Sequence, residues 1–555
     1  MHVSIINRIN ETHTERDAWR AHESHTHARA HGASHVVYPA NTHFINPRQN
    51  PPSNPLIFLI FFANTMSGYL GALSELSGKA TVGEYGVTIV KLQDSPAQCT
   101  LACFLTQLEP DLFETYHVPY QNVLWCEERA AGEIELAYAV DLGENVSLHT
   151  EVLSVGAYAH ETHPDVAQQV LALAYKQSQP APRVLVVLNN HGGQGNARKL
   201  YHTDILPVLR AAHVEYTYIE TGYSRHATEI ARELELDEYD IVACCSGDGV
   251  PHEIINGFFQ RPDRARAFDQ IALTQLPCGS GNALSLSSHG TSNAGRATLR
   301  MLKLARSRMD AMAVHQNGTT TLLFLSQAFG AIADADIGTE HLRWMGAVRF
   351  DLGVAHRLLA KTTYPCDLYV QYAMKDKSEI QGHYDKHRVT LSDTRPVQEE
   401  DLEPRFEDTS LPGWEQLPLY ITDDLNIFYV GKMPYVLGDA QFFPAALPDD
   451  GCMDLVVTTA KTSFFKMAKL LFSVDRGGHV HSPDVLHAKI KAYKLVPRVR
   501  LDHHYLLVDG ESFPVQPLQV EVLSKVLTVL LDDGFFVDTC FTQLEDGSVC
   551  VRESV

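Results

Sequence analysis

One aspartate stands out as the residue of this chain best placed to do chemistry. Asp248 lies in the turn Ser246-Gly247-Asp248-Gly249, which follows an apolar run from Asp240 to Cys245. Glycine on both sides leaves the carboxylate accessible at the end of a strand. It could act there as a general base, as a Mg²⁺ ligand or as a turn former, because Asp-Gly pairs are common in turns. The neighbouring sequence has to decide between these roles.

Two other glycine-rich turns frame this one along the chain. They are Gly192-Gly193-Gln194-Gly195 and Gly279-Ser280-Gly281-Asn282, each of which follows a short apolar run and precedes a helical pattern. Glycine lets backbone N–H groups approach a polyanion closely, and a helix N-terminus adds favourable partial charge. Turns at the ends of neighbouring parallel strands gather at one edge of a sheet. The pattern therefore predicts a site for a phosphate compound, with Asp248 acting on its partner.

The elements around these turns alternate between strand and helix patterns. The unbroken apolar run Val184 to Leu188 is typical of a strand buried on both faces of a parallel sheet. We expect strands at 184–188, 214–219, 240–245 and 271–276, with helices at 197–212, 226–236 and 251–259 between them. This order predicts a doubly wound α/β nucleotide-binding lobe over residues 183–318.

The remaining sequence predicts further regions on either side of this lobe. Residues 1–65 contain many histidines and little periodicity, which favours a disordered extension over a metal-binding tract. Several β-rich runs followed by one helix at 165–177 predict a small pleckstrin-homology-like module. An antiparallel β-sandwich follows the α/β lobe and contains one helix, expected at 463–471. The expected boundaries are 82–176 for the module, 319–530 for the sandwich with a solvated acidic insertion near 375–413, and 531–555 for a C-terminal tail.

Composition narrows the class of protein. A net charge of −22 argues against a nucleic-acid partner, and it leaves any attraction to anionic lipid to a local patch or to apolar contact. Ten scattered cysteines favour a reduced, intracellular protein. No Gly-x4-Gly-Lys-Ser/Thr or Asp-Phe-Gly sequence occurs, so the P-loop and protein-kinase layouts are excluded.

Four blocks of this sequence resemble the sphingosine kinases. The first two, Ser246 to Gly257 and Pro277 to Leu284, are shared with diacylglycerol and ceramide kinases. The third is more specific: it runs from Ser326 to Asp336, continues through Arg343 to Phe350, and resembles that family's lipid-binding segment. The fourth, Val508 to Glu511, is similar to a late nucleotide-contacting turn. Together the resemblance covers about residues 183–530.

The resemblance implies an enzyme that uses ATP and Mg²⁺ to phosphorylate the primary hydroxyl of a sphingoid base. By position, Asp248 is the general base, and Ser326 and Asp336 hold the lipid head group in the sandwich lobe. The resemblance also implies that the nucleotide is bound by Asn189, Gly192, Gly193, Gly195, Thr221, Ser246, Gly247, Gly249, Glu253, Gly279, Ser280, Gly281, Asn282, Arg343, Arg349, Asp509, Gly510 and Glu511. Ligands for the metal stay unassigned. We also expect a cytoplasmic protein held peripherally on intracellular membranes, with a homodimer as one candidate assembly.

Two features bear on the choice of substrate and on activity. A sphingoid head group carries an ammonium, to which a carboxylate such as that of Asp336 can bind. A diacylglycerol has no cation. The first turn departs from the family, because Asn190-His191 replaces the usual proline and its neighbour and Gln194 stands where lysine is common. Arg198 and Lys199 follow and could compensate for that lysine. A diacylglycerol or ceramide kinase and a non-catalytic lipid-sensing protein therefore stay open as alternatives.

Overall fold

A computed structural model describes ten stretches of the chain, all of which belong to one compact unit spanning residues 76–555. They are residues 78–92, 113–130, 132–143, 145–155, 165–193, 195–338, 360–388, 395–438, 440–498 and 504–542. The extension expected at 1–65 lies outside these residues, as do Gln194, Arg343 and Arg349.

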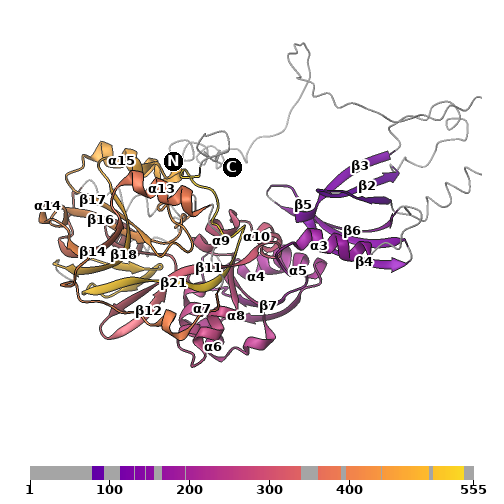
Figure 1. The fold of residues 1–555 in the computed structure, drawn as a ribbon, viewed down its shortest axis with the longest axis horizontal. Helices are drawn as coiled ribbons and strands as arrows, with labels where there is room; N and C mark the ends of the chain where they lie inside the picture. Colours follow the sequence, from indigo (N-terminus) through magenta and orange to yellow (C-terminus); the bar gives the residue numbers. More distant parts are fainter. Residues whose placement is uncertain are drawn as a thin grey trace, which may run out of the picture. The chain divides into compact units, whose positions relative to one another are not determined.

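The first described region is a six-stranded sheet with one helix (Figure 1). Its strand order is β3-β2-β1-β6-β5-β4, and all neighbours are antiparallel except β1 and β6. The strands are β1 (Lys79–Val82), β2 (Gly86–Leu92), β3 (Phe113–Pro119), β4 (Val123–Ala130), β5 (Glu133–Asp141) and β6 (Val146–Val155). Helix α3 (Val166–Tyr175) confirms the helix expected at 165–177, and Asp165 caps it by accepting the backbone N–H of Ala167 at 3.0 Å. The likeness of this region to a pleckstrin-homology module stays a prediction.

A parallel sheet with helices on both faces follows. Its strands β7 (Arg183–Leu188), β8 (Glu215–Glu220), β9 (Ile241–Ser246) and β10 (Ala272–Pro277) lie in the order β10-β9-β7-β8. Successive residues of β7 enter two different cores: Val186 packs in the one that contains residues of α5, and Val187 in the one that contains residues of α6. Figure 1 shows these two helices on opposite sides of β7. The expected α/β arrangement is confirmed in this coarse form.

The helices of this lobe differ from the expected ones in two places. They are α4 (Ala197–Leu200), α5 (Leu206–Ala211), α6 (His226–Glu233), α7 (Gly249–Phe259), α8 (Arg264–Gln270), α9 (Ala283–His289) and α10 (Ala294–Met301). The single helix expected at 197–212 contains a π-helical turn at Tyr201–Ile205, just before Pro207, which has no N–H for an α-helical bond. Helix α7 begins at Gly249, two residues earlier than expected, because Asp248 already has a helical backbone with φ −70° and ψ −17°.

One long strand near the end of the chain joins the α/β lobe to the β lobe. Strand β21 (Leu518–Leu531) pairs in parallel with β10 and antiparallel with both β11 (Ala305–Gln316) and β18 (Leu486–Pro497). The boundary expected at residue 318 falls inside the hairpin of β11 and β12 (Thr319–Leu323). Strand β11 was not expected because Arg306, Arg308 and Asp310 interrupt its apolar pattern. The neighbouring strand and loop segments bury Arg308 and Asp310.

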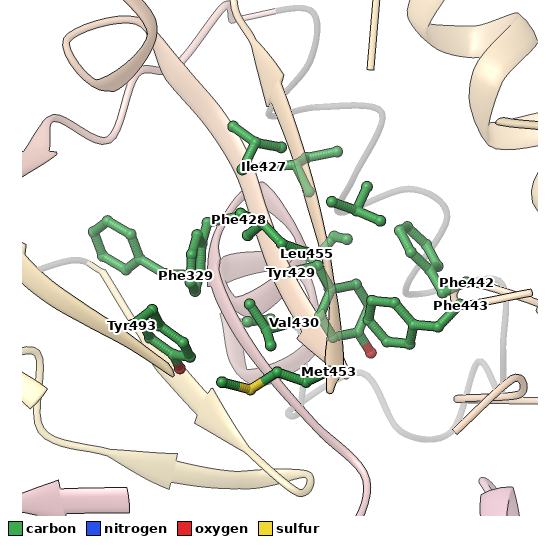
Figure 2. Packing of buried hydrophobic residues seen from close by; sticks show 14 of the residues in the cluster. Phe329, Ile427, Phe428, Tyr429, Val430, Phe442, Phe443, Met453, Leu455 and Tyr493 are labelled. Carbon is green, nitrogen blue, oxygen red and sulfur yellow. The ribbon is translucent and has the colours of Figure 1, made fainter. Parts of the chain in front are cut away.

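The β lobe is mainly antiparallel, which confirms a β-rich C-terminal region. Its strands follow the order β20-β19-β13-β16-β17-β18, with β14 beside β18 and β15 beside β14. Figure 2 shows its core, where Phe428 packs against Tyr493, and Tyr429 against Phe442 and Phe443. The remaining elements are β13 (Ser326–Gly330), α11 (Ala331–Gly338), β14 (Cys366–Met374), α13 (Lys377–His387), β15 (Trp414–Gln416), α14 (Leu419–Thr422), β16 (Leu425–Gly431), β17 (Met453–Thr459), α15 (Phe464–Phe472), β19 (Leu506–Val508) and β20 (Glu511–Phe513).

Three expectations about the β lobe have outcomes in the structure. Helix α15 confirms the helix expected at 463–471. The insertion expected to be solvated is partly packed, because α13 buries Ile380 and Tyr384. The C-terminal tail is also packed where it is described, since Phe541 is only 2% exposed. No helix among the described residues is long and apolar enough to cross a membrane.

A buried network of charges crosses the β lobe where β11, β16, β17 and β18 meet. The Lys432 ammonium lies 2.6 Å from both Asp310 and Asp450, and all three side chains are excluded from solvent. Lys489 extends the network, with its ammonium 2.9 Å from Asp450 and 3.0 Å from Asp454. The attraction of Asp310 and Asp450 raises the pKa of Lys432 to about 12 despite its burial. The lysine therefore stays charged, and its carboxylate partners depend on it.

We predict that Lys432→Met lowers the free energy of unfolding by about 3 to 5 kcal/mol, because it leaves Asp310 buried without its lysine and Asp450 with only one of its two lysines. Chemical denaturation of the full chain measures the loss. Lys461→Met is the matched control, since Lys461 forms an ion pair of the same length, 2.6 Å to Asp424, on the surface. Equal stability of the two variants would contradict the role of the buried network.

Candidate active site

The three glycine turns meet at the carboxyl ends of β7, β9 and β10. A Cβ atom built on Gly193 would lie 3.2 Å from the Cα of Gly279, and one built on Gly247 would lie 3.4 Å from the same atom. A Cβ on Gly279 would lie only 2.3 Å from the Cα of Gly247. Backbone packing this close excludes any side chain at Gly279. The structure thus brings together the turns that the sequence places far apart.

Polar side chains fix the shape of these turns from within. Asn282, at φ +59°, accepts the N–H of Gly279 at 3.0 Å and donates its amide to the Gly279 carbonyl at 2.9 Å. Asn189 accepts the N–H of His191 at 2.9 Å, and the Thr221 hydroxyl donates to the Leu188 carbonyl at 3.2 Å. Their direct contact with a nucleotide stays a prediction, as it does for Gly192, Gly195, Ser246, Gly249, Ser280 and Gly510.

Asp248 lies where the middle turn runs into α7, with its carboxylate aimed at the third turn. Its Oδ1 accepts the side-chain amide of Gln275 at 3.1 Å and the backbone N–H of Ala283 at 2.8 Å. Its Oδ2 fills the space beside Gly281, where a Cβ would come within 2.3 Å. Removal of the carboxylate from water raises the pKa of Asp248 to about 6, and the charge of Asp509 acts in the same direction. The hydrogen bonds from Gln275 and Ala283 oppose this rise.

Asp509 joins several backbone segments of the structure through its carboxylate. Its buried carboxylate accepts the backbone N–H groups of Phe324, Leu325 and Ser326 at 3.0, 3.0 and 2.9 Å. His252 on α7 lies 3.1 Å from its Oδ2. These partners give Asp509 a structural role, and its contact with a nucleotide stays a prediction.

Glu253 also has a structural role, and its contact with a nucleotide stays a prediction. Its two carboxylate oxygens accept the backbone N–H groups of Arg225 and Ala227, at 3.1 and 3.0 Å, at the start of α6. A carboxylate at a helix N-terminus satisfies backbone donors and suits the helix dipole, which accounts for this residue structurally. Glu511 is different, because it is exposed and its Oε1 lies 3.7 Å from the Cβ position of Gly249. It stays at the edge of the site, as expected.

Asn256, which sequence reasoning missed, also ties the lobes together. Its amide donates to the Leu322 carbonyl and accepts the Leu322 N–H, both at 2.9 Å. Helix α7, which begins just after Asp248, is therefore fixed to strand β12. Asn256 lies inside the block from Ser246 to Gly257 that resembles the family. Its place in that block could have indicated its importance from the sequence.

Tyr429 is a second residue that the sequence did not single out. The hydroxyl of Ser326 on β13 donates to the Tyr429 hydroxyl on β16 at 3.4 Å. Burial raises the pKa of Tyr429, and Asp336, Asp509 and Asp248 add to this effect, so the phenol lies in the field of three carboxylates. Figure 2 shows its ring packed against Phe442 and Phe443. A tyrosine in an apolar strand carries no sequence signal of such a position.

Helix α11 places Asp336 near this pair of hydroxyls. The helix is held by the buried carboxylate of Asp334, which accepts the Tyr364 hydroxyl at 2.8 Å and the backbone N–H of Tyr505 at 3.1 Å. Asp336 lies half a turn further on and is partly exposed. The structure therefore brings Asp248, Ser326 and Asp336 into one electrostatic neighbourhood around Tyr429.

A narrow apolar pocket lies beyond Tyr429 in the β lobe. It has a cavity volume of about 10 Å³ and lies between β16, β17 and α15, next to the Phe442 ring that contacts Tyr429. Its lining residues are Ile427, Phe442, Val456, Thr458, Met467, Leu470, Leu471, Val474, His479 and Val485. Nearly all of them are apolar, which suits a hydrocarbon chain.

The structure gives little support for the positive charges that we expected beside the phosphates. Arg343 and Arg349 lie outside the described residues. Arg198, which we expected to compensate for Gln194, forms an ion pair with Glu220 at 2.7 Å. Among the described residues there is also no group of three histidine, cysteine or acidic side chains that could hold a metal by itself.

Comparison with known proteins agrees with this arrangement of lobes. The diacylglycerol kinase catalytic domain matches residues 183–314, and the YegS C-terminal NAD kinase beta sandwich-like domain matches residues 425–531. A crystal structure of a diacylglycerol kinase from Bacillus anthracis str. Sterne covers 63% of this chain and 97% of its own, at 18% identity and a TM-score of 0.40. That likeness is too weak to add to the argument.

Three curated relatives share longer sequence matches. Sphingoid long chain base kinase 5 of Saccharomyces cerevisiae is 39% identical over 459 residues, which are 72% of this chain and 66% of that protein. Sphingoid long chain base kinase 4 of Schizosaccharomyces pombe is 31% identical over 75% of this chain and 88% of its own. Sphingosine kinase 1 of Homo sapiens is 30% identical over 62% of this chain and 89% of its own. With its two matched domains and these relatives, the chain belongs to the sphingoid long-chain-base kinase family.

Proposed function

We propose that this protein transfers the γ-phosphoryl group of ATP to the primary hydroxyl of a sphingoid long-chain base, giving the base 1-phosphate and ADP. The observation that carries the proposal is the Asp248 carboxylate. It has a raised pKa and lies where three glycine turns converge, in the same neighbourhood as Ser326 and Asp336. Membership of the family supports the same activity.

Each part of the site has a task in this reaction. The backbone of the three turns cradles the phosphates, and Glu511 lies at the nucleotide edge. Asp248 takes the proton of the lipid hydroxyl as its oxygen bonds to the γ-phosphorus and the bond to the β-phosphate oxygen breaks. A pKa of about 6 leaves the carboxylate ionised at neutral pH while keeping it a stronger base than an ordinary aspartate.

The residues fit a Mg²⁺ ion that arrives with the nucleotide. Mg²⁺ commonly keeps several waters and uses one or two carboxylates together with substrate phosphates, so it needs no cluster of three protein ligands. Asp248 and Glu511 are the carboxylates at the cradle that could contribute. When bound, the ion supplies neutralisation of the charge on the phosphates.

The lipid is recognised by charge at one end and by apolar surface at the other. The Asp336 carboxylate binds the ammonium of the sphingoid base. The hydroxyls of Ser326 and Tyr429 lie beside the end of the lipid that carries the primary hydroxyl. The apolar pocket next to Phe442 accepts part of the hydrocarbon chain. A neutral diacylglycerol has no ammonium for Asp336 to bind, which favours a long-chain base.

The setting of the enzyme follows from its substrate. A lipid with a long hydrocarbon chain resides in a membrane, so we propose that the protein works peripherally at intracellular membranes from the cytoplasm. A pleckstrin-homology-like role for the six-stranded sheet, and a homodimer, stay predictions.

The activity itself is tested by transfer of labelled phosphate from Mg²⁺-ATP to sphingosine, phytosphingosine, ceramide and diacylglycerol in mixed micelles. We expect label only on the free bases. Asp248→Asn should lower kcat by about 10² to 10⁴-fold, because the general base is lost, while ATP affinity stays within a few-fold. Asp533→Asn, at an exposed position, is the control. Label on diacylglycerol or ceramide would move the protein to a sister kinase, and no label from a folded protein would favour a lipid sensor.

The pH dependence of kcat/KM reports on Asp248 directly. We expect activity to rise with pH through an acidic limb near pH 6, where the carboxylate loses its proton. Gln275→Leu removes a hydrogen bond that stabilises the charged form, so the limb should move to higher pH by about one unit. Gln270→Leu, whose amide donates to the Leu236 carbonyl in the same lobe, should leave it in place. A limb that stays fixed in Gln275→Leu would contradict the assignment.

Recognition of the head group makes a separate prediction. Asp336→Ala should raise KM for sphingosine by about tenfold or more, equivalent to about 1.4 kcal/mol, while KM for ATP changes little. Asp336→Asn keeps the size of the side chain and removes only its charge, so it should reproduce most of the effect. Equal changes in KM for sphingosine and KM for ATP would show that Asp336 does not bind the ammonium of the lipid.

A further inference from the structure

Helix α15 in the β lobe has two different apolar faces. Met467, Leu470 and Leu471 point inward and line the apolar pocket. Phe465, Lys469 and Phe472, spaced four and three residues apart, lie on the opposite face and are exposed. Phe465 is 83% exposed and Phe472 is 55% exposed, although phenylalanine is usually buried. A short helix with an apolar outer face needs an explanation beyond packing.

A neighbouring helix adds to this outer face. Leu419 and Tyr420 of α14 are 54% and 67% exposed. The ammonium of Lys461, four residues before Phe465, lies 3.2 Å from the Tyr420 carbonyl and so holds α14 close to the start of α15. We call Leu419, Tyr420, Phe465 and Phe472 the α14–α15 patch. It contains four of the ten large exposed hydrophobic residues in the described part of the chain.

Lysines accompany the exposed phenylalanines of α15, whereas Asp423 and Asp424 directly follow α14. Residues 458–473 contain three lysines and no acidic residue, whereas the net charge of the protein is −22. Lys461 and Lys466 pair with Asp424 and Asp484 at 2.6 and 3.0 Å. Lys469 lies between the two exposed phenylalanines and has no ion pair among the described residues. Aromatic residues and lysine on the outer face of a helix are typical of elements that lie at a bilayer surface.

We propose that the α14–α15 patch docks on the surface of an anionic lipid bilayer, and that the substrate chain enters the pocket beneath α15 from that bilayer. The proposal rests on the proposed function, because it takes the lipid substrate as given. A bilayer is preferred over a protein partner because the opposite face of the same helix lines the apolar pocket. One helix then contacts the lipid phase on its outer face and the lipid chain on its inner face.

The size of the pocket supports this route. Its volume of about 10 Å³ is room for about one water molecule, so a long hydrocarbon chain requires α15 to shift outward. In water such a shift exposes apolar side chains such as Met467 and Leu470. Against a bilayer it exposes them to hydrocarbon instead, which removes the hydrophobic cost.

The test combines vesicle binding with activity, using the full chain. Co-sedimentation is measured with vesicles of phosphatidylcholine alone and with added phosphatidylserine. The double variant Phe465→Ser/Phe472→Ser should bind the mixed vesicles at least tenfold more weakly than the wild type. Lys469→Glu should lose most of the gain that phosphatidylserine gives. The matched control is Tyr85→Ser/Leu142→Ser, which changes two exposed apolar residues of the N-terminal sheet and should bind like the wild type.

Activity separates this proposal from the proposed function. For sphingosine embedded in vesicles, kcat/KM of the Phe465/Phe472 double variant should fall at least tenfold, whereas for a short-chain base dissolved as monomers it should stay within twofold. Wild-type binding by the double variant, equal loss in the control, or equal loss of activity on the dissolved base would each overturn the docking surface. An inactive wild type that binds vesicles through the patch would overturn the kinase assignment and leave the surface standing.

Discussion

The carboxylate of Asp509 is the constraint on which the geometry of this site depends. It accepts three successive backbone N–H groups at the start of β13 and contacts His252 on α7. These contacts join the β lobe, which carries Ser326 and Tyr429, to the helix that begins beside Asp248. A buried carboxylate with four partners resists displacement, because moving it would leave several donors unsatisfied. The same charge helps to raise the pKa of Asp248, so Asp509 both fixes the surroundings of Asp248 and shifts its pKa.

Glycine provides the second constraint, by allowing backbone where a side chain would not fit. Gly279 lets the middle and third turns touch, and Gly281 leaves space for the Asp248 carboxylate. The space freed by these glycines is where a polyanion can meet backbone N–H groups. Asn282 then holds the third turn with two hydrogen bonds.

The β lobe combines a rigid interior with an apolar outer surface. Its buried lysines and aspartates join β11, β16, β17 and β18 through specific charged contacts, which fix the strands beside the pocket. On the other side of the pocket, α15 is held mainly by apolar contacts and presents phenylalanine to solvent. Apolar contacts have no directional requirement, so α15 can shift at lower cost than the charged strands opposite it. This asymmetry suits a lobe that has to admit a lipid chain.

The sequence by itself determined the three glycine turns, the aspartate of the middle turn and the α/β lobe, because each depends on residues close together in the chain. A glycine turn after an apolar run needs only local geometry, and β7 to β10 appear as continuous apolar segments. The roles of Asp509 and Glu253, the place of Tyr429 and the strand β21 that joins the lobes were decided by the tertiary structure. They depend on contacts across many residues, such as Asp509 with His252, for which local sequence carries no signal. The charged residues of β11 are buried because distant segments supply partners for them. These charges interrupt the apolar pattern, so the sequence did not predict the strand.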